Sequence, residues 1–123
     1  MPSLRALVFD AYGTLFDVHS VVALCDELWP GRGAALSQLW RAKQLEYTWQ
    51  RSLMRRYEDF GRVTEAGLRY ACLALGLVPG DAHRRRLMDA YLKLATFPEV
   101  TGVLAELKAM KLRLAILSNG SPA

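Results

Sequence analysis

Two short apolar segments, residues 4–9 and 112–117, constrain the fold of this 123-residue chain more than any other feature. Each is too short to form an independent helix, and Val8 and Phe9 in the first segment favour a strand. Neither segment shows a clear alternation of apolar and polar residues, which is typical of parallel strands that are covered on both faces. The sequence therefore predicts an α/β fold in which the two segments pair as parallel strands.

Small polar residues follow both predicted strands. Asp10 comes directly after the first strand, and Ser118 and Asn119 follow the second. In open α/β sheets ligands bind at the carboxyl ends of the strands, where Gly13 would allow a sharp turn and Thr14 would offer a hydroxyl group. Taken alone, Asp10 is equally well explained as an acid that forms a turn or caps a helix. The small polar residues after the second strand favour a functional role for Asp10, in a site that both strand ends form.

Apolar residues at helical spacing fill the region between these two segments. They predict helices over about residues 18–29 and 34–54, and a further helix that opens at Thr64 and closes at Gly76. A final helix over about residues 101–110 leads directly into the second apolar segment. Helices thus separate the two predicted strands.

The chain is predicted to contain two domains. Residues 1–16 and 96–123 include both apolar segments and are predicted to form an α/β core. Residues 17–95 are predicted to form an α-helical cap that is inserted into this core.

One arginine interrupts the apolar stripe of the helix predicted over residues 34–54. Arg41 aligns with Leu45 and Thr48 in steps of four and three residues, so a permanent cation stands on a stripe that is otherwise apolar or weakly polar. From the residues alone, Arg41 is either an ordinary surface arginine or a cation that faces a binding site.

The charge of the chain favours a small anionic ligand over nucleic acid. The formal net charge is +4, and basic residues cluster only at residues 55–56 and 84–86, which solvated helix faces explain. No recognised nucleic-acid-binding module accompanies these clusters, so no nucleic-acid partner is expected. A modest positive charge suits a small anionic substrate.

The sequence predicts no membrane-spanning segment, no structural zinc site and no disulfide bonds. The longest apolar runs are too short to span a bilayer, and residues 1–5 lead into no signal-like apolar region. We therefore expect a cytoplasmic protein with no membrane partner. Cys25 and Cys72 lie among apolar residues at helical spacing and are expected to be buried thiols.

Two motifs connect these observations to a known family. Residues 10–14 (Asp-Ala-Tyr-Gly-Thr) and 117–120 (Leu-Ser-Asn-Gly) resemble the first and second motifs of the haloacid dehalogenase superfamily, and more narrowly of its L-2-haloacid dehalogenases. The resemblance covers the whole chain but only the first half of the family's domain. It implies a Rossmann-like core with a parallel sheet, incomplete here, and an inserted helical cap.

The family's third motif, a lysine, and its fourth, an acidic stretch, would lie beyond position 123. Because that lysine would stabilise the ionised nucleophile, the 123-residue chain by itself is expected to be inactive.

The resemblance implies that Asp10 is a nucleophile, and Tyr12 distinguishes the possible reactions. Phosphatases of the superfamily place a second acid two residues after the nucleophile, where this chain has Tyr12. An alkoxide leaving group needs a proton from such an acid, whereas a halide leaves as a stable anion. Loss of the acid favours carbon–halogen cleavage. The alternatives are a weakened, magnesium-dependent phosphatase in which Tyr12 packs against the cap, and an inactive fragment or interaction module.

By resemblance, the reaction is the hydrolysis of L-2-haloalkanoic acids to D-2-hydroxy acids through an aspartyl ester. Arg41 would receive the departing halide, beside an apolar wall of Leu45 and Phe60. The expected catalytic residues are Asp10, Thr14, Arg41 and Ser118, and the expected substrate-binding residues are Ala11, Tyr12, Arg41, Leu45, Phe60, Ser118 and Asn119. The resemblance implies no metal or other cofactor, with magnesium needed only by the phosphatase alternative. It also implies a homodimer formed through the cap.

Overall fold

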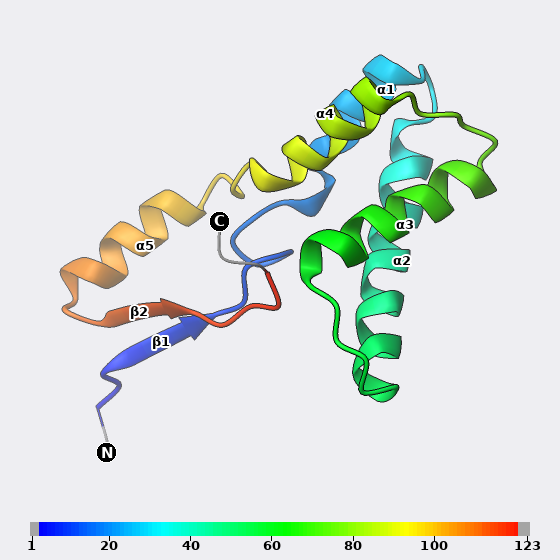
Figure 1. Ribbon diagram of the computed structural model, residues 1–123. Coiled ribbons are helices and arrows are strands. Elements are labelled where there is room, and N and C mark those ends of the chain that lie inside the picture. The colour runs from blue at the N-terminus through cyan, green and yellow to red at the C-terminus, as the bar shows by residue number, and fades with distance from the viewer. Residues whose placement is uncertain (1–2, 121–123) are drawn as a thin grey trace. The chain divides into compact units, whose positions relative to one another are not determined.

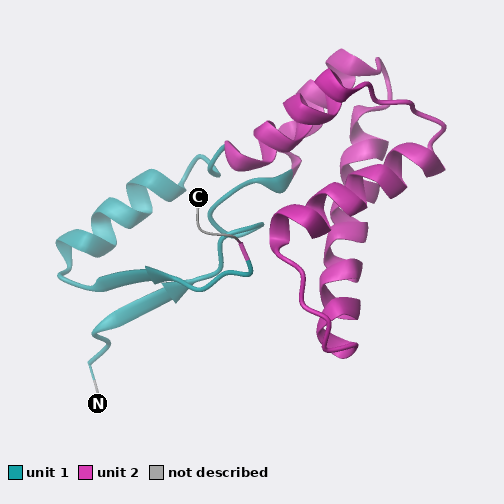
Figure 2. Ribbon diagram, viewed as in Figure 1, with its two compact units in different colours: residues 1–18, 95–119 teal, residues 19–94, 120–123 magenta. Residues whose placement is uncertain are grey.

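The computed structural model describes residues 3–120 of the chain. In chain order the elements are β1 (Ala6–Phe9), a short 3-10 helix η1 (Val18–Val21), α1 (Val22–Leu28), α2 (Gly33–Leu53), α3 (Phe60–Ala74), α4 (Asp81–Leu92), α5 (Val100–Ala109) and β2 (Arg113–Ile116) (Figure 1). They form two compact units (Figure 2). The α/β unit contains residues 3–18 and 95–119, and the helical unit contains residues 19–94 and, of the described residues beyond them, Gly120.

The α/β unit is organised by the pairing of β1 with β2. The two strands are parallel, in a register that runs from Ala6 opposite Arg113 to Phe9 opposite Ile116. This confirms the predicted α/β class with a parallel sheet. Several apolar side chains on the described strands remain exposed, with Val8 64% and Ile116 56% exposed. Parallel sheets are normally covered on both faces, so this sheet is incomplete.

The core of the helical unit lies where α2 crosses α3 (Figure 1). Leu36, Trp40 and Leu68 are completely buried there. The crossing is close because Gly67 has no side chain: a Cβ atom at this position would lie 3.1 Å from the backbone nitrogen of Gln44. The indole nitrogen of Trp40 also donates a hydrogen bond of 2.8 Å to the carbonyl oxygen of Thr64. Packing and hydrogen bonding together fix the two helices against each other.

The start of α3 differs from the prediction. The helix begins at Phe60 and not at Thr64, because Asp59 adopts an extended conformation and its Oδ1 accepts a 2.8 Å hydrogen bond from the backbone nitrogen of Arg62. Thr64 lies one turn inside the helix, where its hydroxyl group donates to the carbonyl oxygen of Phe60 at 2.6 Å. A threonine side chain can cap the start of a helix or donate a hydrogen bond to the carbonyl group four residues earlier. Thr64 does the second, and Asp59 supplies the cap.

Both cysteines are buried free thiols in the helical unit, as predicted. Burial raises the pKa of the Cys25 thiol to about 11 and also raises the pKa of Cys72. At neutral pH both side chains are therefore protonated and behave as small apolar groups. Among residues 3–120, no helix is both long enough and apolar enough to cross a membrane.

Candidate active site

Asp10 lies at the carboxyl end of β1, beside the end of β2. The backbone nitrogen of Leu117 donates a 2.9 Å hydrogen bond to the carbonyl oxygen of Phe9, one residue past the paired strands. Asp10 and Ser118 are the next residue on each side of this bond, and Asn119 follows. The structure therefore brings Asp10, Ser118 and Asn119 to the same edge of the sheet, where α/β proteins bind ligands.

The turn after Asp10 is fixed by its own backbone. The carbonyl oxygen of Ala11 accepts hydrogen bonds of 3.0 Å from the backbone nitrogens of Leu15 and Phe16. Gly13 donates to the carbonyl oxygen of Phe16 at 2.8 Å and has a φ of +86°, a left-handed conformation that favours glycine. The backbone nitrogen of Ala11 donates to Oδ1 of Asp10 at 2.9 Å. The carboxylate is thereby held at the start of a hydrogen-bonded turn.

The polar groups of this edge differ in their access to solvent. Asp10, Thr14 and Asn119 are exposed, whereas Tyr12 and Ser118 are half-buried. Thr14 belongs to the same turn, where its backbone nitrogen donates to the carbonyl oxygen of Ala11 at 3.3 Å. An exposed carboxylate on a hydrogen-bonded turn can act as a nucleophile toward a small electrophile that reaches the edge of the sheet.

The other predicted site residues lie in the helical unit. Arg41 and Leu45 are one turn apart on α2, and Phe60 is the first residue of α3. All three side chains are half-buried. Nη1 of Arg41 donates a 2.7 Å hydrogen bond to Oε1 of Gln44. A half-buried cation is less well screened by water than a surface cation and can attract a small anion more strongly.

Gln44, a hydrogen-bond partner of Arg41, was not predicted from the sequence. It is completely buried, and its Nε2 donates to Oγ1 of Thr64 at 2.8 Å. The spacing of the residues could have indicated that Gln44 is buried. Leu36, Trp40 and Gln44 follow one another in steps of four residues and lie on one buried stripe. An amide at the end of an apolar stripe must find hydrogen-bond partners inside the protein.

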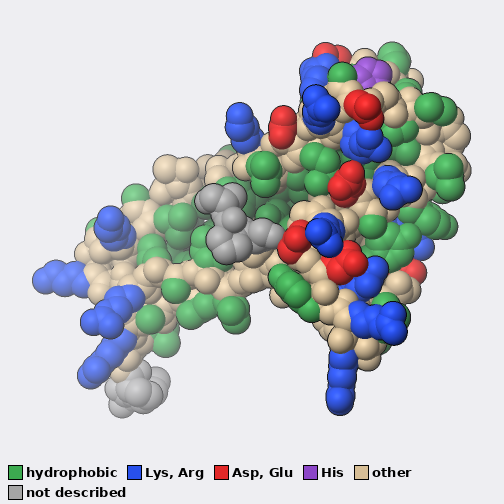
Figure 3. Space-filling model, in the orientation of Figure 1, with side chains coloured by type: hydrophobic (Ala, Val, Ile, Leu, Met, Phe, Trp, Pro, Cys, Tyr) green, Lys and Arg blue, Asp and Glu red, His purple; other side chains and the backbone are tan. Residues whose placement is uncertain are grey.

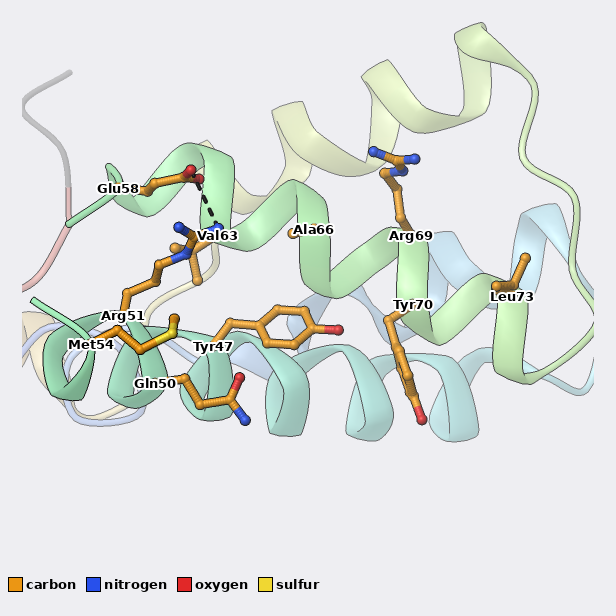
Figure 4. Close-up of a pocket in the computed structure, with 10 residues that line it drawn as sticks. All are labelled: Tyr47, Gln50, Arg51, Met54, Glu58, Val63, Ala66, Arg69, Tyr70 and Leu73. Carbon is orange, nitrogen blue, oxygen red and sulfur yellow. Dashed lines mark ion pairs between the residues drawn. The ribbon is translucent and has the colours of Figure 1, made fainter. Parts of the chain in front are cut away.

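A separate groove of about 480 Å³ lies between α2 and α3 (Figure 4). An ion pair of 3.4 Å between Arg51 and Glu58 lies at one end of it. The described residues that line the groove are Tyr47, Gln50, Arg51, Met54, Glu58, Val63, Ala66, Arg69, Tyr70 and Leu73. Arg41, Leu45 and Phe60 are not among them, so this groove is distinct from the predicted site. Within residues 3–120, no group of three or more His, Cys, Asp or Glu side chains could hold a metal ion.

Comparison with known proteins identifies relatives along nearly the whole chain. The family model of haloacid dehalogenase-like hydrolases matches residues 4–123. An (S)-2-haloacid dehalogenase of Pseudomonas sp. (strain YL) is 59% identical over 99% of this chain and 53% of the relative. An enzyme of the same name from Pseudomonas putida is 53% identical over 98% of this chain and 53% of the relative.

Solved structures agree with these sequence relatives. The L-2-haloacid dehalogenase from Xanthobacter autotrophicus with chloropropionic acid covalently bound matches with a TM-score of 0.89 and 48% identity, over 98% of this chain and 48% of that one. Another dehalogenase matches with a TM-score of 0.92 and 45% identity, over 98% of this chain and 54% of that one. The chain thus spans about half the length of the relatives that it matches.

Proposed function

This chain belongs to the haloacid dehalogenase-like hydrolases, and from that premise we propose that the whole protein hydrolyses L-2-haloalkanoic acids to D-2-hydroxy acids. The observation that carries the proposal is Asp10, at the carboxyl end of β1 in a chain closely similar to a dehalogenase that holds chloropropionic acid covalently. Tyr12, where a phosphatase of the superfamily would have its second acid, supports the same reaction.

In the first step, a carboxylate oxygen of Asp10 attacks carbon 2 of the substrate from the side opposite the halogen. The new carbon–oxygen bond forms as the carbon–halogen bond breaks, and the halide leaves with the bonding electrons. Because Oδ1 of Asp10 accepts the hydrogen bond from Ala11, we assign the attack to the other oxygen. The product is an aspartyl ester with inverted configuration at carbon 2.

In the second step, water attacks the carbonyl carbon of this ester. The acyl carbon–oxygen bond breaks, the leaving oxygen takes up a proton, and the D-2-hydroxy acid departs. Asp10 returns to its carboxylate form, and the balance of the two steps is one halide ion and one proton released for each water consumed. Division of one hydrolysis into two easier steps is the advantage of covalent catalysis.

The remaining site residues hold the substrate and stabilise charge in this proposal. Ser118, Asn119 and the backbone amide of Tyr12 bind the substrate carboxylate, and Ala11 orients Asp10 through its 2.9 Å hydrogen bond. Arg41 receives the departing halide, and Thr14 hydrogen-bonds Asp10 or the attacking water. Leu45 and Phe60 exclude water around the halide, which strengthens its attraction to the guanidinium.

The proposed reaction uses no metal or other cofactor. We expect the whole protein to release chloride from L-2-chloropropionate at the same rate with and without EDTA, because the halide needs neither a proton nor a metal to leave. Halide release and chiral chromatography of the hydroxy acid measure the outcome, with D-2-chloropropionate as the matched control substrate. Magnesium-dependent release of phosphate from an aryl phosphate, without halide release, would instead support the phosphatase alternative.

The location and the domain roles are further parts of the proposal. We assign residues 1–16 and 96–123 to a catalytic core and residues 17–95 to a cap. The free thiols Cys25 and Cys72 suit the reducing cytoplasm, where we place the protein. Lys and Arg side chains are spread over the visible face of the molecule (Figure 3), which supports a small anionic substrate and not nucleic acid.

We also propose that a second copy of the chain occupies the groove between α2 and α3. Leu53, Tyr57 and Leu73, on or beside these helices, are 84%, 83% and 83% exposed. Arg51 and Glu58, which pair with each other at 3.4 Å at one end of the groove, would each meet the opposite charge of a second copy related by a two-fold axis, so the ion pairs could extend across the contact.

Sedimentation of the whole protein is expected to give a dimer that Leu73→Glu converts to a monomer, because the substitution places a charge in the apolar contact. Leu92→Glu changes a leucine that is 71% exposed on α4 and serves as the matched control. A monomeric parent protein, or equal dissociation of both variants, would exclude this interface.

A further inference from the structure

A chain of hydrogen bonds joins Arg41 to the first turn of α3. It runs from Nη1 of Arg41 to Oε1 of Gln44 (2.7 Å), from Nε2 of Gln44 to Oγ1 of Thr64 (2.8 Å), and from Oγ1 of Thr64 to the carbonyl oxygen of Phe60 (2.6 Å). Two of its members are almost completely buried, with Gln44 0% and Thr64 2% exposed. We propose that Gln44 is a positioning residue that holds the Arg41 guanidinium in place for the departing halide.

The direction of donation in this chain is fixed by chemistry. A guanidinium can only donate, so the oxygen of the Gln44 amide must face Arg41 and its nitrogen must face Thr64. The hydroxyl group of Thr64 has one proton, which goes to the carbonyl oxygen of Phe60 and leaves a lone pair for the Gln44 nitrogen. The amide therefore has one orientation that satisfies all of its partners here.

Packing prevents the Gln44 side chain from leaving this position. Gln44 lies at the close crossing of α2 and α3, where a Cβ atom on Gly67 would approach its backbone nitrogen to 3.1 Å. The indole nitrogen of Trp40, one turn earlier on α2, donates a 2.8 Å hydrogen bond to the carbonyl oxygen of Thr64. A buried amide that lost its partners would have a large desolvation cost, so the network is maintained as a unit.

The neutral charge of the amide matters for the proposed reaction, on which this inference rests. A carboxylate at position 44 would also hold the guanidinium, but it would offset the positive charge that is needed for a halide. Gln44 instead supplies a strong acceptor without a countercharge, and Thr64 ties it to the Phe60 turn. Arg41 and Phe60, the proposed cation and part of the proposed apolar wall, are thereby set by one network.

The first test changes the charge beside Arg41 and keeps the hydrogen-bond acceptor. In the whole protein, Gln44→Glu keeps the size and the acceptor of the side chain, and we expect it to lower kcat for L-2-chloropropionate by about tenfold or more and to weaken inhibition by bromide. Gln38→Glu introduces the same charge at an exposed position of α2 and is expected to leave both values unchanged. Equal kcat and bromide inhibition in the parent and Gln44→Glu would overturn the proposal.

The second test is a double-mutant cycle, which a purely structural role would not satisfy. Gln44→Met removes the acceptor at similar volume and is expected to lower kcat about tenfold in the parent protein but less than twofold in an Arg41→Ala background. The same loss in both backgrounds would show that Gln44 does not act through Arg41, and would overturn the proposal. If circular dichroism shows that Gln44→Met is unfolded, Thr64→Val takes its place in the cycle.

Halide release by the parent protein separates a failure of the proposed function from a failure of the positioning role of Gln44. Absence of halide release by the parent would contradict the proposed function itself. Halide release by the parent, with no coupling between Gln44 and Arg41, would contradict only the positioning role.

Discussion

Replacement of Asp10 by asparagine is expected to abolish halide release by the whole protein, with kcat lower by at least about 10⁴-fold. An amide is a far weaker nucleophile than a carboxylate, so the ester cannot form at a useful rate. The asparagine oxygen can still accept the hydrogen bond from Ala11, which in the structure joins the amide of Ala11 to Oδ1 of Asp10. The measurement is halide release at saturating L-2-chloropropionate.

The matched control for this prediction is Asp89→Asn, which removes one negative charge from an exposed position on α4. Its kcat should equal that of the parent, and both variants should have parental circular dichroism spectra. Residual turnover of Asp10→Asn above about one percent of the parent value would mean that another group attacks the substrate, since loss of the nucleophile removes far more.

Replacement of Arg41 by alanine is expected to cost on the order of 3 kcal/mol or more of transition-state stabilisation while the protein stays folded. Negative charge develops on the halide as the carbon–halogen bond breaks, and the guanidinium on α2 would stabilise it beside half-buried Leu45 and Phe60. The effect should appear in kcat more than in KM, because the charge develops only along the reaction.

Arg85→Ala, at an exposed position of α4, is the control for the general loss of a positive charge. It should keep the parental kcat. Near-normal turnover by Arg41→Ala would identify Arg41 as a structural cation, bonded to Gln44, that does not stabilise the halide.

The sheet and its edge were predictable because local composition and a simple topological rule agree. Residues 4–9 lack both the length and the periodicity of a helix, and β1 forms within them at Ala6–Phe9. The same holds for residues 112–117 and β2, at Arg113–Ile116. Since parallel strands present their carboxyl ends at one edge, placement of Asp10 beside Ser118 followed from the sequence.

The start of α3 and the network at Gln44 were less accessible from the sequence. Asp59 and Thr64 are both acceptable helix caps, and the choice between them depends on backbone conformation that only the folded chain defines. Gln44 occupies the buried stripe of α2, but a polar residue on such a stripe becomes interpretable only when its partner is known. Thr64 lies twenty residues away on another helix.

The roles assigned to the site residues had a different origin. The residues alone left Asp10 and Arg41 open to ordinary structural explanations, and family resemblance supplied the chemistry. Spacing along one chain does not report which side chains from separate units act together. Those roles therefore remain predictions for the substitutions described above.

The register of β1 with β2 also governs the order in which this protein can fold. The pairing of Ala6 with Arg113 closes a loop of roughly a hundred residues, for which the entropy cost is about 4 kcal/mol if the loop is flexible. Residues 19–94 of the helical unit are a continuous stretch within that loop, so they can fold first through nearby contacts and shorten the flexible part. During synthesis, the residues around Asp10 leave the ribosome early but gain their neighbouring strand only after the helices have been made. Assembly of the sheet edge that carries Asp10 is therefore expected to be the late step in the folding of this chain.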